Sequence, residues 1–457
     1  MSKKNIPVEK NKTYTGEVED LTYEGLGVVK IERYPIFVEN ALPGEKVTFK
    51  IISTGNKFSL GEMESIENPS PDRVEDRGAV YSQIGNMPLQ HLSYDKQLEF
   101  KRQQLENNFQ RTAHIEKLNI ADTLGMEDPY GYRNKVQIPV REVDGQLETG
   151  YYKKRSHDLV PLEDYLIHDP KIDEAIIIIR DILRKYHIPA YDEANGTGDI
   201  RHIIIRRGYY TDEMMIVLVT NGKKLLNSDE LVKEIKEQLP EVVSIVQNIN
   251  DKKTSVILGK KSQVLLGTDS YHDKLFDFTF EISHQSFYQT NPTQTEKLYQ
   301  TAIDFADLNG DEVVIDAYCG IGTLTLPLAQ KAKLVYGIEI VEDAVNNAKK
   351  NAEANGVDNI EFYTGAAERI ISDWANGDRK ADVIVVDPPK KGLDKHFLDA
   401  VLTMKPEKFV YVSCNPATLA RDVKVLAEDG YKVSKVQPVD MFPQTTAVES
   451  VTLLTRN

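Results

Sequence analysis

The last third of the chain repeats one pattern that narrows its possible folds sharply. From Val313 onward, apolar runs of four to six residues alternate with segments of helical pattern. Because buried parallel strands read as short apolar runs separated by helices, this alternation predicts an α/β fold with a doubly wound sheet. The predicted parallel strands are Val313–Asp316, Leu334–Glu339, Ile360–Tyr363, Asp382–Asp387 and Phe409–Ser413. Helices are predicted from Glu342 and Pro416, and Tyr431–Pro438 and Ser450–Thr455 complete seven strands as an antiparallel pair.

The 457 residues are too many for one compact core, so other domains must precede this sheet. From Tyr14 to about residue 68, strands of period two alternate with glycine and proline turns, which predicts a small OB-like β-barrel. Residues 68–73 read as a linker and Tyr94–Phe109 as a helix. Between residues 130 and 280, strands such as His202–Arg206 mix with helices such as Ser228–Gln238, which predicts a central α+β domain.

Composition excludes several classes of protein. No apolar run reaches membrane-spanning length and no apolar signal region follows the start, so we expect a cytoplasmic protein. Two cysteines give no disulfide framework and exclude a cysteine-built metal site. The net charge of −15 argues weakly against a nucleic-acid partner, although local basic clusters remain possible. These clusters are Lys153–Arg155 with His157, and Arg201–His202 with Arg206–Arg207; the alternative is a solvated face.

A glycine-rich loop after the first predicted strand indicates a cofactor site. It runs Asp316-Ala-Tyr-Cys-Gly-Ile-Gly-Thr323, and Glu339 ends the next strand, where an acid can accept hydrogen bonds from ribose hydroxyls. The spacing fits NAD as well as S-adenosylmethionine, and the loop alone could be a turn and a helix cap. Thr325 in place of a third glycine, and a substrate domain ahead of the sheet, favour the methyl donor.

Two further motifs end predicted strands at the same edge. Asp387-Pro-Pro-Lys390 is either a strand-terminating turn or a rigid platform for a ligand. N-methyltransferases use a similar motif followed by an aromatic residue, which Lys390 is not. Cys414 ends the fifth strand, where a lone cysteine is most often a buried hydrophobe. Its place before a predicted helix would favour the thiolate, whereas Cys319 in the cofactor loop reads as packing.

A cysteine at this edge suits methylation of uracil at carbon 5. Addition of a thiolate to carbon 6 turns carbon 5 into an enolate carbon that attacks an electrophilic methyl group. A base must then remove the proton from carbon 5 so that the thiolate can leave. Glu449, before the last predicted strand, is the best candidate for this base; taken alone it would be a surface acid.

Taken together, these motifs resemble the uracil-5 methyltransferases that act on ribosomal and transfer RNA. The resemblance covers nearly the whole chain, and the motifs occur in the family's order: Ser286-Phe-Tyr-Gln-Thr-Asn-Pro292, Asp316-Ala-Tyr-Cys-Gly-Ile-Gly322, Asp387-Pro-Pro-Lys-Lys-Gly392, Val412-Ser-Cys-Asn-Pro416 and Glu449. It implies an S-adenosylmethionine cofactor, with Cys414 as nucleophile, Glu449 as base and Phe287 beside a flipped base. The residues that it implies for the cofactor or target base are Gln289, Tyr318, Gly320, Gly322, Thr323, Glu339 and Asp387.

The N-terminal part resembles a TRAM domain, which points to the ribosomal branch of the family with 23S rRNA as partner. We also expect a monomer. The resemblance divides the chain into a barrel (1–68), a central RNA-binding domain (74–92 and 126–284) and a Rossmann-like class I methyltransferase domain (93–125 and 285–457). It places Arg133, Lys135 and His157 in the RNA-binding region, and packs the helix from Tyr94 on the methyltransferase domain.

One departure from the ribosomal pattern concerns an iron–sulfur cluster. Many ribosomal members carry four cysteines, but here Gly78, Ile84, Met87 and Tyr165 stand at those places. We therefore expect no cluster, no metal and a resemblance to the cluster-less Gram-positive type, some of which modify two uridines. The target must be flipped out of its stack or lie in an unpaired loop.

Other functions stay open at this point. A tRNA uracil-5 methyltransferase would carry the same motifs. Methylation of adenine N6 disagrees with Lys390, and cytosine-5 enzymes set their cysteine in different local motifs. An RNA-binding ribosome-assembly factor with a secondary methyltransferase activity is the alternative from another class of protein.

Overall fold

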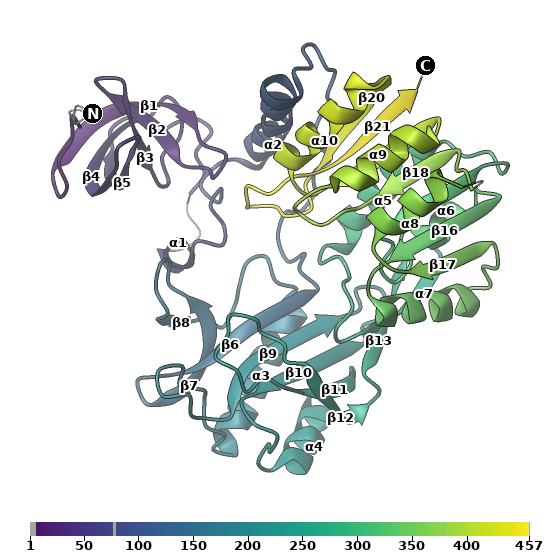
Figure 1. The fold of residues 1–457 in the computed structure, drawn as a ribbon. Helices are drawn as coiled ribbons and strands as arrows, with labels where there is room; N and C mark the ends of the chain where they lie inside the picture. The colour runs from purple at the N-terminus through teal and green to yellow at the C-terminus, as the bar shows by residue number, and fades with distance from the viewer. Residues whose placement is uncertain (1–5, 76–78, 378, 457) are drawn as a thin grey trace.

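The computed structural model describes residues 6–75, 79–377 and 379–456. Three sheets follow one another along the chain: a closed barrel, a seven-stranded central sheet and a seven-stranded C-terminal sheet (Figure 1). A two-stranded ribbon lies between the last two in the sequence, made of β13 (Ser270–Leu275) and β14 (Phe278–Ser283).

The N-terminal barrel is built from five short strands in the order β1-β2-β3-β5-β4, as the alternating pattern predicted. Alternate side chains point inward, so that Val47, Phe49 and Ile51 of one strand are fully buried while Lys46 and Lys50 are exposed. The strands are β1 (Thr13–Leu21), β2 (Gly27–Ile31), β3 (Tyr34–Val38), β4 (Lys46–Thr54) and β5 (Ser59–Ile66).

The central sheet is apolar on both faces, which explains why its middle strands are hydrophobic throughout. Met214, Ile216 and Leu218 face the helices α3 (Pro170–Lys185) and α4 (Ser228–Gln238). Met215 and Val217 face the other way and join the core of the C-terminal sheet. The strands, in sheet order, are β12 (Lys261–Gly267), β11 (Val242–Ile249), β10 (Met214–Thr220), β9 (Ile200–Arg207), β6 (Lys135–Val143), β7 (Gln146–Tyr152) and β8 (Leu159–Pro161).

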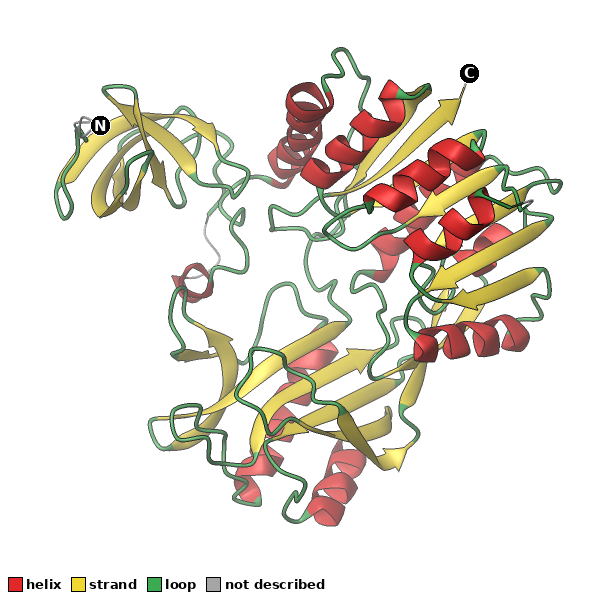
Figure 2. Ribbon diagram, viewed as in Figure 1, coloured by secondary structure: helices red, strands yellow, loops and turns green. Residues whose placement is uncertain are grey.

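The C-terminal sheet confirms the predicted doubly wound fold. Its five parallel strands and closing antiparallel pair are ordered β17-β16-β15-β18-β19-β21-β20. Helices cover both faces (Figure 2), with α5, α6 and α7 on one and α8, α9 and α10 on the other. The strands are β15 (Val313–Ala317), β16 (Leu334–Glu339), β17 (Ile360–Thr364), β18 (Val383–Val386), β19 (Lys408–Ser413), β20 (Tyr431–Val439) and β21 (Glu449–Arg456). The helices are α5 (Pro292–Ala306), α6 (Thr325–Ala329), α7 (Glu342–Ala354), α8 (Ala367–Ala375), α9 (Lys395–Met404) and α10 (Pro416–Glu428).

One early helix crosses to this last sheet. After α1 (Ala79–Ile84), the helix α2 (Tyr94–Asn108) and its continuation η1 (Phe109–Ala113) lie beside α10 (Figure 1). Leu105 and Phe109 are buried in the same core as α8, α9 and α10. The segment between the barrel and the central sheet is thereby fastened to the C-terminal part, as the resemblance implied.

Candidate active site

Polar side chains gather where neighbouring parallel strands end. Glu339 is the last residue of β16, Asp387 directly follows β18, and Cys414 directly follows β19. Asp316 lies near the end of β15, between β16 and β18 in the sheet. Because the carboxyl ends of parallel strands meet at one edge, the fold brings these four residues to the same side of the sheet.

The loop after β15 has the shape of a cradle. Tyr318, Gly320 and Gly322 all have positive φ angles, at 69°, 55° and 90°. A side chain added at Gly320 would meet nothing within 4 Å, so the backbone there borders open space. The Glu339 carboxylate accepts hydrogen bonds from the backbone N–H groups of Gly320 (3.1 Å) and Val341 (2.9 Å), which fixes the acid against the loop.

Two apolar side chains beside this acid escaped the sequence analysis. Ile340 and Val341 follow Glu339 and are 66% and 53% exposed. The sequence does show an apolar pair directly after the acid that ends the strand, but such a pair is equally typical of the strand's own last residues. An acid for ribose hydroxyls, an open glycine cradle and apolar side chains nearby fit the nucleoside part of S-adenosylmethionine.

A buried tyrosine links several of the predicted cofactor residues. The Tyr299 hydroxyl, on α5, lies near the side chains of Gln289, Thr323 and Asp387 and acts on the pKa of Asp387. The sequence analysis missed Tyr299, because a tyrosine on the buried face of a helix looks like an ordinary core residue. Its three partners come from separate segments, so it holds those segments in one arrangement.

The carboxyl groups of the site are poorly hydrated. Burial raises the pKa of Asp316 and of Asp387 to about 7. The hydroxyl of Thr325 donates to Asp316 at 2.6 Å and partly offsets this rise in pKa. Burial, with the charge of Asp387 as a second cause, raises the pKa of Glu449 to about 8. A cationic ligand would offset the cost of keeping such groups ionised, and the sulfonium of S-adenosylmethionine is a cation.

Cys414 and Glu449 occupy adjoining positions on two paired strands. The antiparallel register of β19 and β21 ends at Ser413 opposite Ser450, and the next positions are Cys414 and Glu449. Cys414 is half-buried and Glu449 is 5% exposed, so the reading of Glu449 as a surface acid is wrong. Directly opposed residues of an antiparallel pair lie close together on one face.

The surroundings of Cys414 oppose formation of the thiolate. Burial, followed by the negative charges of Glu449 and Asp387, raises the pKa of the Cys414 thiol to about 11. Cys319, in contrast, is buried in the cofactor loop as predicted, where its sulfur lies close to Gly337.

Local hydrogen bonds hold the motifs next to one another. Asn415 caps α10 by accepting from the Ala417 N–H (3.0 Å), and its amide donates to the Lys390 carbonyl (3.2 Å). Asn291 caps α5, and its amide donates to the Met441 carbonyl (3.0 Å). Phe287, in the segment before α5, is 70% exposed to solvent. An exposed aromatic ring of this kind is typical of a surface that binds a large partner.

A family model described as tRNA (Uracil-5-)-methyltransferase matches residues 93–457, and one described as TRAM domain matches residues 7–63. The chain belongs to the tRNA (uracil-5-)-methyltransferase family. It is 51% identical to an uncharacterized RNA methyltransferase of Enterococcus faecalis and 54% identical to one of Lactiplantibacillus plantarum, over 99% of each chain. The crystal structure of Pyrococcus abyssi tRNA (uracil-54, C5)-methyltransferase, in complex with S-adenosyl-L-homocysteine, is 27% identical with a TM-score of 0.79. The alignment covers 97% of this chain and 100% of that one.

The residues expected to contact RNA divide into two groups in this family member. Arg133 and Lys135 line one pocket beside Thr290, which follows Gln289. His157 lies outside that pocket, 81% exposed, with its ring 3.2 Å from the Glu193 carboxylate. No helix among the described residues is both long and apolar enough to cross a membrane.

The predicted basic surface clusters need correction. Arg201, Arg206 and Arg207 are at most 7% exposed, because each is committed to an internal partner. Arg201 donates to the Asn250 and Lys252 carbonyls, Arg206 to those of His284 and Ser286, and Arg207 pairs with Asp169 and Asp212. In the other cluster, Lys154 (2.8 Å) and Arg155 (3.1 Å) pair with Glu39 of the barrel.

Apolar and aromatic packing fills the place of the family's cysteine cluster. Ile84, Met87 and Tyr165 are buried together with Tyr81 and Tyr132 in one core. Gly78 lies outside the described residues. Within the described ranges, no group of three or more His, Cys, Asp or Glu side chains is arranged to hold a metal ion.

Proposed function

We propose that this protein methylates carbon 5 of one or two loop uridines in 23S rRNA, with S-adenosylmethionine as cofactor. The observation that carries the proposal is that the register of β19 and β21 ends at Ser413 and Ser450, so that Cys414 and Glu449 come next, close enough for the charge of Glu449 to raise the pKa of Cys414. Tyr318, Gly320, Gly322, Thr323, Glu339, Gln289 and Asp387 would hold the cofactor. The cofactor supplies an electrophilic methyl group on a positively charged sulfur.

The chain's own residues perform the remaining steps. Cys414, after losing its proton to solvent, adds its sulfur to carbon 6 of the uracil, and carbon 5 becomes the carbon that accepts the methyl group. Glu449 then takes the proton from carbon 5, the carbon 6–sulfur bond breaks, and the Cys414 thiolate is regenerated. The raised pKa of Glu449, about 8, suits a carboxylate that accepts a proton near neutral pH.

Transfer RNA is the second candidate substrate. The Pyrococcus abyssi enzyme is a tRNA methyltransferase, and its alignment covers 97% of this chain, barrel included. The barrel alone therefore does not separate a ribosomal from a transfer RNA substrate. Support for the ribosomal choice is the resemblance to ribosomal members that lack the iron–sulfur cysteines.

The proposal is tested by mapping 5-methyluridine in both RNA classes from cells with and without this protein. We expect one or two sites in 23S rRNA to lose the modification on deletion, and a Cys414→Ala form to restore none of it. Loss from tRNA instead would replace the substrate, and unchanged modification in both would overturn the proposal. If the Cys414→Ala form fully complemented the deletion although methylation was lost, the main role of the protein would be that of a ribosome-assembly factor.

Purified protein gives a direct test of the chemistry. RNA labelled with tritium at uracil carbon 5 should release tritium in the presence of S-adenosylmethionine, because carbon 5 loses its hydrogen. Methylation at another atom or base would leave that tritium in place.

A further inference from the structure

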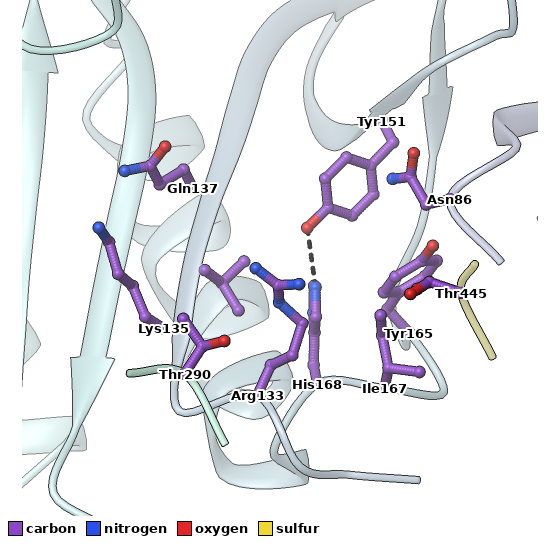
Figure 3. Close-up of a pocket in the computed structure, with 11 residues that line it drawn as sticks. Asn86, Arg133, Lys135, Gln137, Tyr151, Tyr165, Ile167, His168, Thr290 and Thr445 are labelled. Atoms are coloured by element: carbon purple, nitrogen blue, oxygen red, sulfur yellow. Dashed lines mark hydrogen bonds between the residues drawn. The ribbon is translucent and has the colours of Figure 1, made fainter. Parts of the chain in front are cut away.

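A pocket of about 410 Å³ lies between the central sheet and the active-site segments (Figure 3). The central part contributes Arg133 and Lys135, and the C-terminal part contributes Thr290 and Thr445. Thr290 directly follows the predicted cofactor residue Gln289, and Thr445 lies in the loop that leads to Glu449. The pocket is therefore lined in part by the segments that carry the predicted site residues.

The pocket is positively charged. No aspartate or glutamate is among its lining residues in the described ranges, and neither Arg133 nor Lys135 is paired there with a carboxylate. Burial, together with the charges of Arg206 and Arg133, lowers the pKa of Lys135 to about 7. A phosphate group beside this lysine would supply the missing counter-charge and favour its protonated form.

One wall of the pocket is a fixed aromatic ring. The Nδ1–H of His168 donates a hydrogen bond to the Asp173 carboxylate (2.6 Å), and burial lowers the pKa of His168. Its Nε2 then accepts from the Tyr151 hydroxyl (2.7 Å), as Figure 3 shows. These two hydrogen bonds position the Tyr151 ring, and Asn86 lies beside it with an amide that can pair with a base edge.

The target base itself cannot be the occupant. Its carbon 6 must meet Cys414, yet neither Cys414, Glu449 nor Asp387 lines this pocket. A pocket next to the active site that offers two cations, a fixed ring and amide groups matches the chemistry of one unstacked nucleotide.

We propose that this pocket binds the RNA nucleotide next to the target uridine, with its phosphate on Arg133 and Lys135 and its base against the Tyr151 ring. The inference rests on the proposed function. It gives the enzyme a second contact along the strand, so that the sequence beside the uridine is recognised as well as the uridine.

The test uses the full-length protein and an RNA hairpin cut from around the mapped uridine, with tritium at uracil carbon 5. We expect Lys135→Met to raise KM for the hairpin about tenfold and to reduce the slope of log affinity against log salt by about 0.7. Lys135→Arg should recover most of the affinity. Lys233→Met, on the exposed face of α4, is the matched control and should behave as wild type. Unchanged melting and S-adenosylmethionine affinity verify that each variant is folded.

A modified RNA identifies which group the pocket holds. Replacing the phosphate beside the target with a neutral methylphosphonate should weaken wild-type binding as much as Lys135→Met does, and should weaken that variant no further. Removing the neighbouring base should weaken the binding of RNA to wild type roughly tenfold, and should weaken its binding to a Tyr151→Leu variant far less. If the modified RNAs lost the same affinity for wild type and for the variants, while wild type still released tritium, the inference would be overturned and the proposed function would stand. Absence of tritium release by wild type would instead overturn the proposed function and this inference together.

Discussion

At the active-site edge, the buried carboxyl groups that suit the cofactor lower the stability of the folded protein when they are ionised. Asp316, Asp387 and Glu449 have raised pKa values in the folded protein, so between about pH 4 and pH 7 the folded state binds more protons than the unfolded state. Stability must then fall as pH rises through that window. The carboxylates that suit a cationic cofactor therefore reduce the folding stability of the cofactor-free protein.

We therefore expect Asp387→Asn to stabilise the cofactor-free protein strongly at pH 8 and less at pH 5, because the carboxyl loses its proton above about pH 4 in the unfolded chain but only near pH 7 in the folded one. Melting temperatures at the two pH values measure this difference. S-adenosylmethionine should raise the melting temperature of wild type at pH 8 more than that of the variant. A variant that melts below wild type at pH 8 would contradict this account of Asp387.

The reacting residues allow a second prediction. Glu449→Gln leaves an amide that cannot take the carbon 5 proton, so the bond between Cys414 and carbon 6 should persist after methyl transfer. We expect an RNA–protein adduct that survives denaturing electrophoresis, with tritium release lost. The double variant Cys414→Ala/Glu449→Gln should form no adduct. An adduct in the double variant would show that another nucleophile is used.

Sequence reasoning at this scale found residues through their place at strand ends. Cys414, Asp387 and Glu339 follow apolar runs, and the parallel topology brings such ends together. It missed Tyr299, because its partners come from other segments of the chain. It also misjudged the Cys414 thiolate, since burial and the neighbouring charges that raise its pKa depend on tertiary packing.

At the scale of elements, α2 is tied to the loop that precedes Glu449 by buried charges. Lys101 of α2 pairs with Asp440, both side chains are fully buried, and the ammonium also donates to the Phe442 carbonyl (3.0 Å). The hydroxyl of Tyr94 donates to the second Asp440 oxygen at 2.8 Å. The helix thus sets the position of the chain that leads into β21.

Lys101→Met should destabilise the protein by about 3–5 kcal/mol, because it leaves the Asp440 charge buried without its partner. Lys96→Met on the same helix is the matched control: Lys96 pairs with Glu99 at the surface, and its loss should cost less than about 1 kcal/mol. Urea unfolding measures both. Equal effects of the two substitutions would mean that Asp440 is hydrated or neutral.

Elements were easier to predict than their charged contacts. β15 to β19 were evident because strands buried on both faces are apolar throughout. The burial of Arg206 was not, since the carbonyl groups that satisfy it belong to His284 and Ser286, far away in the sequence. A pair of arginines in a strand looks like a surface cluster until those partners are known.

For the whole molecule, the net charge of −15 leaves RNA binding to local surfaces whose relative placement matters. Contacts of Glu39 with Lys154 and Arg155 hold the barrel against the central part. Glu45, fully buried in the barrel, accepts from Arg73 in the linker. The sequence predicted a barrel and a linker but not this placement, because it depends on two cations of a predicted basic cluster, Lys154 and Arg155, whose partner Glu39 lies far away in the chain.

Glu39→Lys tests whether that placement matters. Surface ion pairs contribute at most about 1 kcal/mol each, so global stability should change little. Three neighbouring cations would nevertheless repel, and we expect the barrel to swing outward and the radius of gyration in small-angle X-ray scattering to increase. Glu19→Lys is the control, because Glu19 pairs with Lys30 on the barrel's own surface and both variants have the net charge −15 + 2 = −13. If barrel orientation guides RNA, Glu39→Lys should bind the substrate more weakly than Glu19→Lys although their charges are equal. Equal affinities and equal radii would mean that the barrel is held by its other contacts, such as the approach of Gly25 to Leu89 and Thr446.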